Sequence, residues 1–239
     1  MKTGVIVYGT DSDNPSECAT IEGIVSFLDA RGHKNVRAGF YHGDPGADKV
    51  MYEMFEDGVD TFAILPMVLA EGRMSIWLMP EKIHLPDNCG SWTIIDGKDV
   101  ATRFATALGF DVGIASDILK SIGSPERGKG VILIARGSPL SICEKTVKSY
   151  VKFLQEAGWT AECAFMKHGR TIHEVIEDIS SKGINDVCVV PMFIGPSEKT
   201  LDAITGSISD KGMKINICPK ISEFDSFLAA LESKIPNGW

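Results

Sequence analysis

FYHGDPGADKVMYEMFEDG, residues 40–58, and FMKHGRTIHEVIEDISSKG, residues 165–183, are segments of equal length that begin with Phe and end with Gly. The match continues without a gap, because AILPMVLAEG from Ala63 aligns with CVVPMFIGPS from Cys188 at the same offset, 188 − 63 = 125. Two upstream pairs follow in the same order: VIVYGT (5–10) with ILIARGS (132–138), and FLDARG (27–32) with FLQEAG (153–158). Self-similarity of this extent indicates a repeated structural unit. The chain is therefore predicted to be a tandem duplication.

Both copies alternate short β-branched runs with segments of helical apolar spacing. The predicted strands are 4–8, 36–41, 61–65, 92–95, 131–135, 161–166, 187–190 and 215–218. The predicted helices are 17–31, 47–56, 100–108, 116–121, 143–156, 172–181 and 224–234. Strands that are apolar on both faces and alternate with helices favour a parallel sheet covered by helices. We predict two similar α/β domains, 1–122 and 131–239, that face each other across a cleft, with a Gly/Ser/Pro-rich linker at 123–130.

The composition argues against several classes of function and of site. Acidic side chains outnumber basic ones by 32 to 24, so the net charge is −8, and no cluster of Lys and Arg offers a grip on nucleic acid or an anionic membrane. No apolar run approaches the length of a membrane span, and the start, MKTGV, lacks the apolar core of a signal peptide, so we expect a cytoplasmic protein. The six cysteines include no CxxC pair, which favours buried, reduced thiols over a zinc site or a disulfide framework: Cys18, Cys89, Cys143, Cys163, Cys188 and Cys218.

Ligands of parallel α/β sheets bind beyond the carboxyl ends of the strands. In this chain the rule selects the loops 8–13, 41–45, 70–74, 136–138, 167–169 and 195–199. The sequence contains no Walker motif, no GxSxG and no GxGxxG, so we expect neither a nucleotide cofactor nor serine hydrolysis.

Two segments resemble motifs of the class II tetrapyrrole chelatases, in particular the CbiX-like sirohydrochlorin cobaltochelatases. ILIARGS (132–138) is similar to the family's first strand, which ends in His-Gly-Ser, and LPMVLAEGRMSIWLMPEKI (65–83) is similar to its segment after the third strand. The resemblance spans both halves. It implies an ATP-independent chelatase, a lyase of cobalamin biosynthesis, that inserts cobalt, nickel or iron as a substrate ion into a sirohydrochlorin-type macrocycle.

The family's metal-binding histidines are replaced in this sequence. Position by position, the residues that stand for them are Tyr8 and Arg136 at the first strands, and Met74 and Lys199 after the third strands. Arg and Lys stay protonated and cannot hold a divalent metal at neutral pH, and Met favours soft ions. The usual site is thus absent from both halves.

Two of the five histidines stand near the ends of the second strands, as His42-Gly-Asp-Pro and His168-Gly-Arg. Some longer family members carry a Glu ligand at that place. We hypothesise that His42 and His168, with Glu71 or Tyr8, bind the metal or take protons from the pyrrole nitrogens. The alternative is that both are ordinary turn histidines, because a His followed by Gly is common in turns.

Arg136 and Lys199 suit the carboxylates of a sirohydrochlorin-like substrate, helped by the backbone and side chains of Thr10, Ser12 and Ser138 at helix starts. Met74 is a candidate for packing on the flat ring. The alternatives are plain solvent exposure for the cations and core packing for Met74. Three functions remain open at this point: a chelatase, a catalytically silent tetrapyrrole or metal carrier, and an enzyme acting on another polyanion. We expect a monomer or loose homo-oligomer, since a duplication supplies both halves of a cleft.

Overall fold

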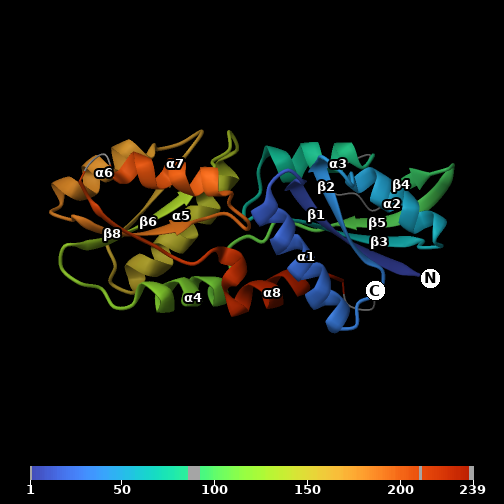
Figure 1. The fold of residues 1–239 in the computed structure, drawn as a ribbon, viewed down its shortest axis with the longest axis horizontal. Coiled ribbons are helices and arrows are strands. Elements are labelled where there is room, and N and C mark those ends of the chain that lie inside the picture. Colours follow the sequence, from blue (N-terminus) through green and yellow to red (C-terminus); the bar gives the residue numbers. More distant parts are fainter. Residues whose placement is uncertain (1, 86–91, 210–211, 237–239) are drawn as a thin grey trace. The chain divides into compact units, whose positions relative to one another are not determined.

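The computed structural model describes residues 2–85, 92–209 and 212–236, which form two compact units (Figure 1). The first unit contains β1 (Thr3–Asp11), α1 (Pro15–Ala30), β2 (Val36–His42), α2 (Ala47–Glu56), β3 (Thr61–Pro66), the π-helix η1 (Met74–Leu78), α3 (Met79–Lys82), β4 (Trp92–Ile95) and β5 (Lys98–Phe104). Its sheet has the order β2-β1-β3-β5-β4. All neighbours are parallel except β4, which runs antiparallel to β5. Figure 1 shows α1 on one face of this sheet and α2 with α3 on the other.

Apolar burial explains why these segments form the first sheet. Residues 4–9 of β1 are all buried, as expected for a central strand that is covered by helices on both faces. On one face, Ile6 and Ile64 pack with Val50, Met51 and Met54 of α2. The spacing of the last three residues puts them on a single stripe of the helix.

One predicted helix is wrong. Residues 98–104 form β5, where the sequence analysis placed a helix at 100–108. Burial alternates along β5, because Val100 and Thr102 are buried while Arg103 is exposed, and this period of two belongs to a strand. A tight turn enters it: Asp96 and Gly97 both have positive φ, 49° and 74°, as a two-residue hairpin turn of this kind requires.

The second unit repeats the layout. It contains α4 (Val112–Ile122), β6 (Lys129–Ala135), α5 (Ser141–Glu156), β7 (Ala161–Phe165), α6 (Ile172–Ser181), β8 (Asp186–Pro191), α7 (Glu198–Ser209), β9 (Lys214–Ile217), the 3₁₀ turn η2 (Ile221–Glu223) and the start of α8 (Asp225–Glu232). Its sheet, β7-β6-β8-β9, is parallel throughout. The predicted α/β class of two similar, helix-flanked sheets is confirmed. The strand β6 begins at Lys129, inside the predicted linker.

The compact units divide the chain differently from the two sequence copies. The first unit joins residues 1–108 with 228–239, and the second spans 109–227. The end of the first copy therefore belongs to the second unit, where Tyr150 Oη donates to Gly109 O over 2.9 Å. The end of the second copy belongs to the first unit, where Glu232 pairs with His33 and Arg31 at 3.1 and 3.3 Å. Those contacts lower the pKa of Glu232.

Within the described part of the chain, no helix has both the length and the apolar character that a bilayer span demands. Five cysteines are free thiols, and Cys89 lies outside the described residues. Burial raises the pKa of Cys218 to about 11, which keeps that thiol protonated.

Candidate active site

The strand register shows which residues of the two copies are equivalent. Tyr8 lies opposite Pro66 in the β1–β3 pair, and Ile134 lies opposite Pro191 in the β6–β8 pair. Because the two prolines match each other in sequence, Tyr8 corresponds to Ile134, at an offset of 134 − 8 = 126. The ends of β1 and β6 can therefore be compared residue by residue.

Arg136 corresponds to Thr10 in this register, since 136 − 126 = 10. The sequence match instead pairs Arg136 with Tyr8. The strand register shows that this pairing is shifted by two residues. Tyr8 is fully buried in the core, and its hydroxyl donates to Met79 O at 3.3 Å. Burial, assisted by the charge of Asp48, raises its pKa far above the ordinary value. This burial argues against the expectation that Tyr8 is a catalytic residue facing an open cleft, and that role stays a prediction.

Thr10 is the half-buried next-to-last residue of β1, and it is held by Glu17 from the first turn of α1. The Thr10 N–H donates to Glu17 Oε1 at 2.5 Å, and its hydroxyl lies 2.9 and 2.8 Å from the two carboxylate oxygens. Burial raises the pKa of Glu17, and the negative charge of Asp11 adds to that, while hydrogen bonds from Thr10 and Asn14 act in the opposite direction. Thr10, a predicted substrate-binding residue, is therefore coupled to a buried acid that the sequence analysis missed.

His42 is the exposed last residue of β2, opposite Asp11 at the end of β1. Its ring stands edge-on to Tyr41, with centroids 4.5 Å apart. Ser12 supports the same edge, because its N–H donates to His42 O at 3.1 Å and its hydroxyl accepts the N–H of Asp44 at 3.0 Å. Ser12 thus fixes the loop that follows His42, and its own hydroxyl is engaged in doing so.

Glu71 has both carboxylate oxygens occupied by protein donors. Oε1 accepts the N–H of Ala107 at 2.7 Å, and Oε2 accepts the hydroxyl of Ser75 at 2.7 Å. This half-buried side chain fastens the loop after β3 to residue 107, which argues against its predicted role as a free ligand or base. Met74 is half-buried and packs against the core cluster of the first unit, so core packing describes it better than ring binding.

The second unit places cations at its strand ends. Arg136 directly follows β6, Lys167 comes two residues after β7, and Lys199 lies in the first turn of α7, after β8. All three side chains are exposed, and their strands are neighbours in the sheet. Ser138 is half-buried, and its hydroxyl accepts the N–H of Leu140 at 3.2 Å, so it stabilises the turn into α5.

A close backbone approach joins the first two of these loops. The N–H of Lys167 donates to Arg136 O at 2.8 Å. Gly137 has a φ of 84°, and a Cβ there would collide with the Lys167 carbonyl oxygen. Only glycine therefore allows the loop after β7 to cross the end of β6. This crossing fixes the backbones of Arg136 and Lys167 side by side.

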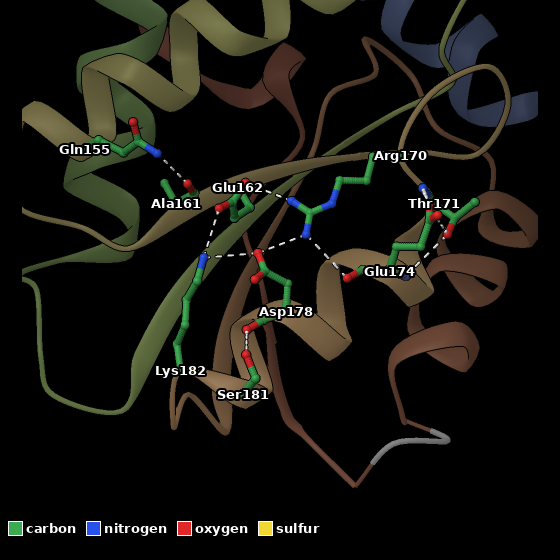
Figure 2. A network of polar contacts seen from close by, with 9 residues as sticks. All are labelled: Gln155, Ala161, Glu162, Arg170, Thr171, Glu174, Asp178, Ser181 and Lys182. Carbon is green, nitrogen blue, oxygen red and sulfur yellow. Dashed lines mark hydrogen bonds and ion pairs between the residues drawn. The ribbon is translucent and has the colours of Figure 1, made fainter.

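Two other cations of the second unit, Arg170 and Lys182, are neutralised by acids, as Figure 2 shows. Arg170 pairs with Glu162 at 3.3 Å and with Asp178 at 2.9 Å, and Lys182 reaches the same two carboxylates at 3.3 and 3.0 Å. The hydrogen bonds from Arg170 and Lys182 lower the pKa of Asp178. Among the described residues, no acidic side chain pairs with the three strand-end cations: Arg136, Lys167 and Lys199.

The two candidate metal ligands are not equivalent. Phe40 and Phe165 hold the same register against β1 and β6, so His42 corresponds to Lys167, 42 + 125 = 167. His168 is one residue further, exposed, with a left-handed φ of 51°. The two histidines belong to different units, and their sharing of one ion stays a prediction. Across residues 2–85, 92–209 and 212–236, no cluster of three or more His, Cys, Asp or Glu side chains is arranged to hold a metal.

The CbiX family model matches residues 4–123 and 130–237, one match for each copy. The sirohydrochlorin cobaltochelatase of Methanosarcina barkeri is 31% identical over 125 residues, which make up 51% of this chain and 95% of that protein. The corresponding protein of Methanosarcina acetivorans is 30% identical over the same shares. These relatives are about half as long as this chain, as a duplication would produce.

Solved structures show the same fold over nearly the whole chain. SirB from Bacillus subtilis with Fe³⁺ has a TM-score of 0.77 at 18% identity and covers 98% of this chain and 94% of its own. The cobalt complex of the sirohydrochlorin chelatase SirB from Bacillus subtilis subspecies spizizenii has a TM-score of 0.75 at 13% identity, with the same coverage. At such identities the likeness concerns the fold alone. Since the family model covers both copies, this chain belongs to the CbiX family.

Proposed function

We propose that the protein binds a carboxylate-rich tetrapyrrole of the sirohydrochlorin type and inserts a divalent metal, cobalt, nickel or iron, as its substrate ion. The observation that carries this proposal is the set of unneutralised cations at the strand ends of the second unit: Arg136, Lys167 and Lys199. In a protein of net charge −8, such a group favours a multiply anionic ligand.

The two units would have different tasks in this reaction. Guanidinium and ammonium groups bind carboxylates through charge-assisted hydrogen bonds, so the second unit is suited to holding the substrate's acid groups. An exposed imidazole binds borderline divalent ions, so His42 and His168 are the candidates for delivering the metal. The same proposal includes a cytoplasmic setting, no nucleotide requirement and a monomer or loose homo-oligomer.

The test is an absorbance titration with sirohydrochlorin, with and without Co²⁺, Ni²⁺ or Fe²⁺, in the absence of ATP. Arg136→Gln and Lys167→Gln should each weaken tetrapyrrole binding by about tenfold, the loss of one charge-assisted contact. Arg127→Gln is the matched control, because Arg127 is exposed and precedes β6, at the opposite end of the same strand. If the control weakened binding as much as Arg136→Gln, the ligand would be responding to overall charge.

A second function, a carrier that binds the tetrapyrrole or the metal without inserting it, is favoured by the state of two predicted catalytic groups. Tyr8 is buried in the core, and Glu71 has both oxygens occupied. A spectral shift on mixing with the ring, without metal uptake, would establish the carrier. A double variant, His42→Ala with His168→Ala, that leaves metal uptake unchanged would remove the histidines from the proposal. The absence of any response to tetrapyrroles would leave the third reading, another polyanion.

A further inference from the structure

Glu17 is the one carboxylate that is buried among the residues described, with 7% of its surface exposed. A charged side chain is rarely buried to this extent unless it is paired. Its partners are Thr10, which donates both its backbone N–H and its hydroxyl to the carboxylate, and the side chain of Asn14. Within the part of the chain that the structure describes, no basic side chain acts on it, and the charged group that does, Asp11, is itself acidic.

The pair stands at the end of the strand that carries the unit's candidate site. Thr10 corresponds to Arg136, the residue that directly follows β6 in the second unit. The helices α1 and α5 are both 16 residues long and share the offset, so Glu17 corresponds to 17 + 126 = 143, which is Cys143. Both residues are buried in the first turn. A buried acid at this place is therefore a property of one copy only.

A capping role alone does not explain this arrangement. Acidic residues in the first turn of a helix usually stay exposed, where they cap the helix at little desolvation cost. Glu174 in α6 does this, because its exposed carboxylate closes a capping box with Thr171. The Glu17 carboxylate instead reaches back to β1 and is buried there. Burial raises the pKa of Glu17, which makes it a better proton acceptor near neutral pH than an exposed carboxylate.

We propose that Thr10 and Glu17 form a proton-accepting pair for metal insertion, at the strand position that Arg136 occupies in the second unit. This inference rests on the proposed function. When the metal enters, a pyrrole N–H bond breaks and its electron pair turns to the metal. The proton passes to Thr10 Oγ1 while the Thr10 hydroxyl proton passes to a Glu17 oxygen. Glu17 afterwards returns the proton through Thr10 to water. Thr10 is the group that touches the substrate, and Glu17 acts through it.

The experiment measures metal insertion into sirohydrochlorin with Co²⁺ as a function of pH. Glu17→Gln should lower the insertion rate at neutral pH by about 100-fold, the usual size of a general-base contribution, and leave tetrapyrrole binding within about twofold. The fall of the rate on the acid side of the wild-type profile should disappear. Glu22→Gln is the matched control, since Glu22 is exposed on the same helix.

A pair of Thr10 variants separates the relay from a structural role. Thr10→Val keeps the β-branched shape and the backbone N–H bond to Glu17 but removes the hydroxyl, and Thr10→Ser restores the hydroxyl. We expect a slow Val variant and a Ser variant close to wild type. The Val variant should also have a lower thermal midpoint, because the buried carboxylate loses a donor, so the rates are compared well below both midpoints. Equal rates in Val and Ser, or a Glu17→Gln variant with the wild-type rate and pH profile, would overturn the inference while the proposed function stands. A wild-type protein that binds the ring but inserts no metal would overturn both.

Discussion

The two units share one fold but carry opposite chemistry at equivalent positions. Near the end of its first strand, the first unit has Thr10, which is hydrogen-bonded to the buried Glu17. The second unit has Arg136 at the equivalent position. At the end of the second strand, His42 corresponds to Lys167. The first unit thus presents hydroxyl, carboxylate and imidazole groups, and the second presents cations.

This difference separates the residues that the fold requires from the residues that can change without loss of the fold. The sheets depend on strands that are buried on both faces, and both copies retain these apolar runs. The side chains beyond the strand ends are half-buried or exposed, so they can change with little cost to folding. Divergence after duplication would therefore concentrate at the edge where ligands bind.

The largest effect should come from breaking the crossing that fixes the cationic edge. Gly137→Ala adds a Cβ against the Lys167 carbonyl at a positive φ, and we expect a loss of about 3 kcal/mol in the free energy of unfolding. Gly183→Ala is the control, because Gly183 has a similar φ of 79° but open space around it, and should lose about 1 kcal/mol. Chemical denaturation measures both. Equal losses would mean that backbone conformation, and not the crossing, sets the cost.

A smaller effect should distinguish paired from unpaired cations. Asp178→Asn removes a shared partner of Arg170 and Lys182, and we expect a loss in the free energy of unfolding that shrinks in high salt. Arg136→Gln removes a cation without a partner and should change the free energy of unfolding by less than about 0.5 kcal/mol. Thermal unfolding at low and high salt compares them. A larger loss for Arg136→Gln would show that the exposed edge also stabilises the fold.

The buried acid predicts a dependence of stability on pH with a defined sign. The pKa of Glu17 is raised in the folded state, so between its ordinary value of 4.5 and the raised value the native state binds more protons than the unfolded state. Its contribution to stability therefore falls as pH rises through that window. The difference in unfolding free energy between wild type and Glu17→Gln should accordingly shift in favour of the variant from pH 4.5 to pH 7. A difference that shifts the other way would place a stabilising charge partner at Glu17.

The smallest effect is expected at Tyr8. Tyr8→Phe removes a single long hydrogen bond to Met79 O and keeps the ring in the core, so the loss should stay below about 1 kcal/mol. Tetrapyrrole binding and metal insertion should not change, as absorbance titration would show. A defect in insertion with an intact fold would return Tyr8 to the site.

The periodicity of apolar residues predicted helices and strands correctly where the spacing in a segment fitted only one kind of secondary structure. The helices 47–56 and 172–181 have the bounds that the sequence analysis gave them. The strand at 98–104 was missed because Val100, Phe104 and Leu108 also fit a helical spacing. The Asp96-Gly97 dipeptide was the signal that indicates a hairpin turn at this place.

The site could be predicted only in part, for two physical reasons. Register between strands is a tertiary property, so the sequence match placed Arg136 beside Tyr8 instead of Thr10. Hydrogen bonds between loops are also invisible in sequence, and they occupy Glu71. A signal for Glu17 did exist, because it shares the helical spacing of Ile21, Ile24 and Leu28, the buried face of α1.

The mismatch between copies and compact units carries an evolutionary consequence. Each copy ends in a helical segment that belongs to the other copy's unit: α4 to the second, and the end of α8 to the first. This reciprocal exchange has the form of a domain swap captured within a single polypeptide. A gene split at the sequence boundary would yield two fragments, each missing a helical segment of its own unit. Separating the copies at that boundary would therefore remove from each unit the packing of one helical segment.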